Sequence, residues 1–271
     1  MNRILFPFES CRILWNTQDL TIFGISFGPM HIVTYSITAL IATLIVSLLA
    51  YYLWKIKGLA KKDFLYIHLI TIFGIFCGAR LFHMLFYQGF GFIEFFIELF
   101  NPHRSGFSSV GGFIGGFIFA VLACKWRKIN IWKYTDCFTL GFGLAFAIGR
   151  IGCYCNPCCY GKHTIMPWGV DFFGDGPRHP TQIYDIINSL FIFTVAWINK
   201  SKERFFKINK LRMFDGSLTL LCLMIYSTIR FIIQFFREDP SIFLNIQFSH
   251  LSFFGMFIFA AIMFYRKSKS K

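Results

Sequence analysis

Residues Ile32–Leu53 read IVTYSITALIATLIVSLLAYYL, a stretch of 22 residues without a charged side chain. An α-helix of this length is about 33 Å long, enough to cross the roughly 30 Å hydrocarbon layer of a membrane. The segment that follows, Trp54–Asp63, carries four lysines. Lysine and arginine collect at the cytoplasmic ends of membrane helices. The stretch therefore predicts a transmembrane helix that runs inward, with its C-terminal end at the cytoplasmic face.

Six further apolar runs follow, at Phe64–Tyr87, Ser108–Cys124, Trp132–Ile148, Thr181–Ile198, Met213–Phe235 and Ser249–Tyr265. Of the 271 residues, 56% are hydrophobic and 15% are charged. A soluble domain has about 25% charged residues. The sequence therefore predicts an all-α, polytopic membrane protein with seven transmembrane helices, in which residues 1–271 form a single integral membrane domain.

The basic residues fall mainly on one side of these seven spans. When the spans alternate in direction, 18 of the 27 Lys and Arg residues share one side with four of the 13 acidic residues. The whole formal charge of +14 then belongs to that side, which the positive-inside rule assigns to the cytoplasm. We therefore expect the N-terminus outside and the C-terminus in the cytoplasm. Because these charges stand at helix ends and form no soluble patch, they exclude a nucleic-acid-binding role.

Four arginines stand within the spans or at their outer ends: Arg80, Arg150, Arg230 and Arg237. A charge at bilayer depth is costly and usually marks function, although a long side chain can instead extend to the interface. Arg230 and Arg237 are seven residues apart, so on one helix they would project along the same face. Guanidinium groups bind phosphate through a bidentate fork. The four arginines together favour a site for an anionic lipid headgroup.

Glycines recur at three- and four-residue spacing in Gly106–Gly116, which reads GFSSVGGFIGG. This spacing is typical of close helix–helix packing through small residues, which is the favoured interpretation. The alternative is a non-helical entry in which backbone amides approach a ligand.

The outer loop, at about residues 150–180, carries the polar site. Its four cysteines are Cys153, Cys155, Cys158 and Cys159. Their CxCxxCC spacing is compatible with zinc or an iron–sulfur cluster, but an oxidising outer compartment favours disulfides. We expect disulfides or plain thiols here, with a metal site and a catalytic thiol as alternatives. Since the chain has nine cysteines, an odd number, at least one thiol is unpaired within it.

Five motifs resemble, in their order along the chain, those of the prolipoprotein diacylglyceryl transferase family, seven-span enzymes of the bacterial inner membrane. They are GARL (Gly78–Leu81), RSGFSSVGGFIG (Arg104–Gly115), GRIG (Gly149–Gly152) with Asn156 and Gly161, PRHPTQIYD (Pro177–Asp185), and Tyr226 with Arg230, Phe231 and Arg237. Tyr35, at the start of the first span, is similar to an early tyrosine of that family. The resemblance covers nearly the whole chain.

This resemblance implies transfer of the diacylglyceryl group from phosphatidylglycerol to the lipobox cysteine of a preprolipoprotein, with release of glycerol phosphate. It implies an active site toward the outer leaflet, and we expect no cofactor and no metal. Arg150 is the first choice for phosphatidylglycerol binding, while Arg230 and Arg237 would clamp phosphate or gate its exit. The other substrate-binding positions that the resemblance implies are Tyr35, Arg80, Gly111, Gly112, Asn156, Gly161, Gln182 and Tyr184.

The chain departs from the family pattern at Val110 (His in typical members), Cys153 (Asn), Cys158 (Glu), Gln234 (Glu) and Asp185 (Glu). It therefore resembles a divergent, cysteine-rich branch. With the family histidine absent, His179 is the remaining candidate for the catalytic base. Its alternative role is to order the loop beside Pro180.

Other function classes stay open from sequence. One is a non-enzymatic or thiol-redox membrane protein that uses the Cys153–Cys159 loop. Another is a paralogue that transfers a different lipid group, and a third is a transporter, because polar residues within spans also line transport paths.

Overall fold

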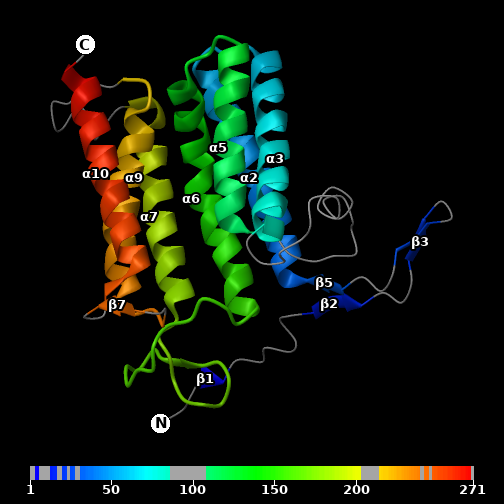
Figure 1. Ribbon diagram of the computed structural model, residues 1–271, viewed down its shortest axis with the longest axis vertical. Coiled ribbons are helices and arrows are strands. Elements are labelled where there is room, and N and C mark those ends of the chain that lie inside the picture. The colour runs from blue at the N-terminus through cyan, green and yellow to red at the C-terminus, as the bar shows by residue number, and fades with distance from the viewer. Residues whose placement is uncertain are drawn as a thin grey trace. The chain divides into compact units, whose positions relative to one another are not determined.

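The computed structural model (Figure 1) describes residues 4–5, 13–16, 20–22, 25–27, 31–85, 108–202, 214–238, 241–243 and 246–269. Its helices are α2 (Thr34–Ile56), α3 (Lys61–His83), α5 (Ser109–Trp126), α6 (Ile131–Cys155), α7 (Thr181–Lys202), α9 (Ser217–Gln234) and α10 (Phe248–Lys269). The strands form short pairs: β1 (Ile4–Leu5) with β6 (Val170–Asp171), β2 (Ile13–Asn16) with β5 (His31–Val33), β3 (Leu20–Ile22) with β4 (Ile25–Phe27), and β7 (Ser241–Phe243) with β8 (Ile246–Gln247). The first pair is parallel and the others are antiparallel.

The helices have the length and surface of a multi-pass membrane protein. Within the described residues, α2, α3, α6, α7, α9 and α10 are long and apolar enough to cross a membrane, while α5 is apolar but shorter. Large apolar side chains point outward, among them Leu48 at 67% exposed and Phe117 at 63%. Polar side chains such as Gln182 and Asn188 are buried instead. This inside-out distribution fits a lipid surround, where apolar surface needs no shielding.

Each predicted span coincides with one of these helices, and the largest difference in length is at α6. The predicted span ends at Ile148, whereas the helix continues to Cys155 and so carries Arg150 within it. The outer loop therefore begins at Asn156 rather than at residue 150. The number of spans, the side of each terminus and the single-domain organisation stay predictions.

The described contacts divide the chain into two compact units, of which the smaller is Tyr51–Tyr134. In it α3 packs closely on α5 through glycines: a Cβ on Gly115 would lie 2.8 Å from the Cα of Gly78. Ser108 caps the start of α5, accepting a hydrogen bond from the amide of Gly111 at 3.5 Å. The glycine-rich segment is thus helical from residue 109, as the packing interpretation predicts.

The larger unit comprises Met1–Ala50 and Thr135–Lys271. Within it α7, α9 and α10 lie side by side, α9 packing against both neighbours (Figure 1). Asp136 of α6 caps α9: its carboxylate accepts from the amides of Gly216 and Thr219 at 2.9 and 3.0 Å. A carboxylate at a helix N-terminus satisfies free amides and opposes the helix dipole. The cap fixes α9 against α6, which matters because both helices carry site arginines.

Candidate functional site

A buried carboxylate joins two arginines that come from different helices. Asp185 of α7 has its Oδ2 atom 3.1 Å from Nε of Arg150 on α6. Nη1 of Arg230, on α9, donates to both carboxylate oxygens of Asp185, at 2.8 and 3.1 Å. The side chain of Asp185 is 1% exposed, that of Arg150 13% and that of Arg230 7%. Two guanidinium groups on one carboxylate leave a surplus positive charge, so the cluster can bind an anion.

Aromatic rings line this cluster, which we call the arginine cluster (Arg150, Asp185 and Arg230). The guanidinium carbon of Arg150 lies 4.8 Å from the ring centre of Phe146, and that of Arg230 lies 5.2 Å from Phe253. Low-polarity walls strengthen electrostatic attraction to an incoming anion. Nε of Arg230 is buried without a hydrogen-bond partner in the described part of the chain. The cluster therefore retains a donor that an anionic group could use.

Of the four span arginines singled out in the sequence, the structure places Arg150 and Arg230 together. Asp185, which the sequence analysis noted as a departure but not as a site residue, is the group that holds them. A signal was available: a carboxylate just inside a predicted span is as costly as an arginine there and implies a partner.

Arg237 lies beyond the end of α9 rather than on it. The helix ends at Gln234, the chain turns, and Arg237 forms a single antiparallel bridge with Gly161. The prediction that Arg230 and Arg237 share one helical face is therefore wrong, because the helix stops before the second arginine. The turn instead brings Arg237 to the loop after α6, where its charge acts on Cys159.

The start of α7 fastens that same loop. Nε2 of Gln182 donates to the carbonyl of Cys158 at 2.7 Å, and Oγ1 of Thr181 donates to the carbonyl of Cys159 at 2.6 Å. Gln182 is fully buried. At Gly161 the backbone approaches so closely that a Cβ would lie 2.8 Å from Cβ of His179. Gln182 and Gly161, both predicted substrate-binding residues, thus shape the loop beside the arginine cluster.

His179 also contacts this loop. Its Nδ1 atom lies 3.0 Å from the hydroxyl of Tyr184, which accepts a 2.8 Å hydrogen bond from Nε1 of Trp168. Its backbone carbonyl accepts from the amide of Gly161 at 2.9 Å. Partial burial lowers the pKa of His179 below its usual value of 6.5, so the imidazole is neutral at pH 7. The residue orders the loop and can also accept a proton.

The C-terminal part of the loop carries a second ionic link. Nη2 of Arg178 donates to Asp175 at 2.7 Å, and its Nη1 atom pairs with Glu238, just after the end of α9. The guanidinium also lies over the ring of Tyr160, 5.1 Å from its centre. These contacts tie the C-terminal part of the loop to Tyr160 near its start and to the segment after α9.

The four loop cysteines separate into two kinds. The sulfur atoms of Cys153, Cys158 and Cys159 are all free thiols within 4.8 Å of one another, whereas Cys155 is disulfide-bonded. Hydrogen bonds from Cys153 and Cys158, helped by the charge of Arg237, lower the pKa of Cys159. Hydrogen bonds with Cys153 and Cys159 raise that of Cys158. Cys155 is thus a disulfide cysteine and the other three are free thiols, and the choice between plain thiols, a metal site and a catalytic thiol at those three stays a prediction.

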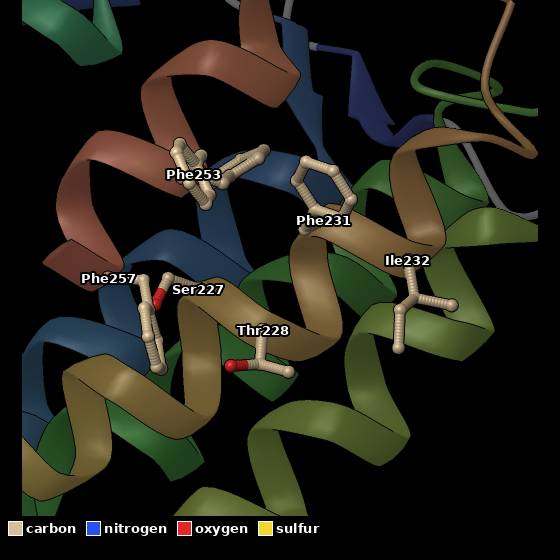
Figure 2. Close-up of a pocket in the computed structure, with 7 residues that line it drawn as sticks. Ser227, Thr228, Phe231, Ile232, Phe253 and Phe257 are labelled. Carbon is tan, nitrogen blue, oxygen red and sulfur yellow. The ribbon is translucent and has the colours of Figure 1, made fainter.

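An apolar groove is lined by residues of α9 and α10 (Figure 2). It has a volume of about 240 Å³, and its lining residues are Ser227, Thr228, Phe231, Ile232, Phe253, Phe254 and Phe257. Phe253 belongs both to this groove and to the aromatic wall of Arg230. The groove thus begins beside the arginine cluster.

The structure places the remaining predicted substrate-binding residues as follows. Arg80, 3% exposed on α3, and Gly111 and Gly112 on α5 belong to the smaller unit. Tyr35 is in the first turn of α2, and its side chain lies outside the described residues. The amide of Asn156 donates to the carbonyl of Gly152 at 2.9 Å, at the turn where α6 ends.

Comparison with known proteins gives the same family as the motifs. The family model "Prolipoprotein diacylglyceryl transferase" matches residues 22–266. A phosphatidylglycerol–prolipoprotein diacylglyceryl transferase of Wolbachia pipientis subsp. Culex pipiens is 32% identical over 221 residues, covering 79% of this chain and 80% of that protein. The protein of that name from Campylobacter jejuni subsp. doylei is 30% identical over 236 residues, covering 83% and 82%. These matches favour a transferase over a thiol-redox protein, and the chain belongs to the prolipoprotein diacylglyceryl transferase family.

Proposed function

We propose that this chain transfers the diacylglyceryl group of phosphatidylglycerol to the lipobox cysteine thiol of a preprolipoprotein. The observation that carries the proposal is the buried arginine cluster, in which Arg150 and Arg230 share one carboxylate. A cluster with surplus positive charge between apolar walls suits a phosphate monoanion that enters from the bilayer. The family membership supplies the class of reaction.

The reaction requires charge stabilisation at phosphate. The thiolate of the acceptor cysteine attacks the carbon of the diacylated glycerol that is bonded to the phosphate oxygen. The S–C bond forms there as the C–O bond breaks. The electron pair of that bond leaves with glycerol phosphate, which gains negative charge as it departs. Arg150 and Arg230, already oriented by Asp185, stabilise this developing charge without reorganising. Until the phosphate arrives, the negative charge of Asp185 offsets the repulsion between the two guanidinium groups.

The apolar groove on α9 and α10 accommodates an acyl chain of the lipid (Figure 2). Phe253 connects the groove to Arg230, so a headgroup at the arginine cluster places its acyl chains near the groove. A lipid can reach this position sideways from the bilayer because the groove lies on exposed helix faces. Gln182, Tyr184 and the loop around Gly161 then enclose the headgroup from outside.

The acceptor thiol must lose a proton before it attacks. His179 is neutral at pH 7 and lies on the loop beside the arginine cluster, so it is positioned to take that proton. Val110, where typical members of the family carry histidine, is 54% exposed on α5 and has no titratable group.

The site faces the outer leaflet of a bacterial inner membrane. This orientation follows from the lysine and arginine residues at the opposite ends of the helices, such as Lys125, Lys128 and Lys133 between α5 and the body of α6. Phosphatidylglycerol and the lipobox peptide are the substrates, and the bilayer supplies the first of them.

Replacing Arg150 tests the proposal. Purified protein in phosphatidylglycerol nanodiscs is incubated with a lipobox peptide, and the diacylglyceryl thioether is measured by mass spectrometry. We expect Arg150→Ala to slow transfer by about 100-fold or more, the usual loss when a group that stabilises transition-state charge is removed. The matched control is Arg127→Ala, because Arg127 is 41% exposed and pairs with Asp63 at the other ends of the helices.

Two results would contradict the proposal. Equal rates for wild type and Arg150→Ala would remove Arg150 from the mechanism. No thioether from the wild type with phosphatidylglycerol or other anionic lipids would overturn the reaction itself.

A further inference from the structure

Three thiols converge where α6 ends and the loop that borders the arginine cluster begins. Cys153 lies in the last turn of α6, and Cys158 and Cys159 follow the turn after it. Their sulfur atoms lie within 4.8 Å of one another. Cys155 is disulfide-bonded and therefore takes no part. The transfer as described above uses none of these three thiols.

The backbone holds this thiol cluster (Cys153, Cys158 and Cys159) in place. The amide of Cys158 donates to the carbonyl of Cys153 at 3.2 Å, and fully buried Gln182 and Thr181 bind the carbonyls of Cys158 and Cys159. Binding sites with rigid ligands lose little conformational freedom when the ion arrives. These contacts hold the three thiols close together before any ion binds.

The spacing and the charge suit one soft divalent ion. Zinc binds thiolate sulfur at about 2.3 Å, which places the sulfurs of a tetrahedral site roughly 3.8 Å apart. The three sulfurs therefore need to contract by about 1 Å at most. Three thiolates and one Zn²⁺ carry a net charge of −1, and Arg150 and Arg237 both interact electrostatically with Cys159. Their positive charge offsets that surplus.

We propose that Cys153, Cys158 and Cys159 bind one Zn²⁺ ion whose fourth position takes the thiolate of the acceptor cysteine. Zinc sites with three protein ligands keep the fourth position for water or substrate, and a thiol that coordinates zinc is deprotonated. The proposal rests on the proposed function, because it gives the second substrate a place beside the first. It also replaces the sequence-based expectation that the chain uses no metal.

The step balances. The acceptor thiol displaces a water molecule from Zn²⁺ and releases its proton to solvent, directly or through His179. The bound thiolate attacks the phosphate-bearing glycerol carbon, forming the S–C bond as the C–O bond breaks. The electron pair goes to glycerol phosphate, which the arginine cluster binds. The thioether is a weaker ligand than the thiolate, so the product leaves and water returns to Zn²⁺.

Metal binding is tested on the full-length chain in nanodiscs, under a thiol-free reductant. After incubation with Zn²⁺ alone and removal of excess metal, we expect one zinc per chain by elemental analysis. Cys158→Ser should lose stoichiometric zinc, whereas Cys77→Ser, a change at a free thiol of α3 in the smaller unit, should keep it. Zinc-free wild type, or full zinc retained by Cys158→Ser, overturns the site, and so does a disulfide among the three thiols that persists under reductant.

The second half of the proposal, that the acceptor cysteine binds the metal ion, is tested by a separate measurement. With Co²⁺ in place of Zn²⁺, the wild type should show a thiolate-to-cobalt charge-transfer band that grows when a lipobox peptide is added. A peptide with serine in place of the acceptor cysteine should leave it unchanged. A band that does not respond to the cysteine peptide overturns the acceptor's place at the metal. If the band responds but no lipid is transferred, the metal site stands and the proposed function fails.

Discussion

Asp185 neutralises two guanidinium groups that would otherwise repel each other inside the protein. Its removal should therefore cost more than the loss of one ion pair. We expect Asp185→Asn to lower the free energy of unfolding by about 3–5 kcal/mol, the range for breaking a buried ion pair from one side. Unfolding in detergent micelles with increasing denaturant measures the change.

An exposed pair provides the control for Asp185→Asn. Asp63 binds Arg127 at a surface where that arginine is 41% exposed, so Asp63→Asn should cost no more than about 1 kcal/mol. Equal losses from the two variants would show that the arginines of the cluster do not depend on Asp185.

Because the pKa of His179 is lowered, we expect the stability of the protein to depend on pH. Burial lowers its pKa in the folded protein below the 6.5 expected for an unfolded chain, so the unfolded chain binds more protons as the pH falls. The stability that neutral His179 contributes is therefore complete above pH 6.5 and declines as the pH drops from 6.5 toward the lower folded-state pKa. Thermal unfolding of the wild type and His179→Gln between pH 7.5 and 5.5 checks this. The variant should lose part of the decline, and identical pH profiles would exclude the effect.

At the scale of the elements, one helix end decides where the arginines lie. α9 starts on the carboxylate of Asp136 and stops at Gln234, so Arg230 projects into the cluster while Arg237 pairs with the loop. The predicted span ended at Phe235, one residue past the observed end, and the expectation of a shared face also assumed that the helix continued to Arg237. The local apolar pattern does not reveal where a backbone leaves a helix to pair with a distant loop residue such as Gly161.

The glycines between α3 and α5 predict a contrast between two neighbouring substitutions. A Cβ on Gly115 would lie 2.8 Å from Cα of Gly78, whereas a Cβ on Gly112 would have its nearest neighbours at an ordinary 3.5 Å. Gly115→Ala should destabilise the protein by about 1–3 kcal/mol, since backbone atoms cannot move aside easily. Gly112→Ala should be neutral or stabilise the helix by up to about 1 kcal/mol. The unfolding assay used for Asp185 measures both, and equal effects would contradict the close packing.

At the scale of the whole molecule, the chain combines long apolar helices with lysine and arginine residues in alternate connections between them. This arrangement predicts that the C-terminus is cytoplasmic and that the loop 156–180 is outside. Alkaline phosphatase, which is active outside the inner membrane, should be active when fused after Gly174 and inactive when fused at the C-terminus. A fluorescent protein should show the reverse pattern. Exchange of the two patterns would invert the predicted topology.

Much of the fold follows from the sequence, because hydropathy is a local property of each stretch. The helix α2 begins two residues after the predicted start of the first span and ends three residues past its predicted end, and α7 begins at the predicted Thr181. The arginines of the cluster could also be singled out, because a charged residue within or beside a long apolar run is easy to recognise in a sequence. Their partner was less visible, because Asp185 stands 45 residues from Arg230 and needs the packing of α7 on α9 to reach it.

By itself, then, the sequence determined the long apolar helices and the family, and it singled out Arg150 and Arg230 as candidate site residues, because each of these depends on composition or motifs within a short stretch. The tertiary structure alone decided that one carboxylate bridges Arg150 and Arg230, that Arg237 faces the loop, and that three of the four loop cysteines converge while Cys155 does not. These contacts depend on where the helices end and how they pack. A buried charge or thiol interacts with the groups that this packing brings close to it, some of which are distant in the sequence.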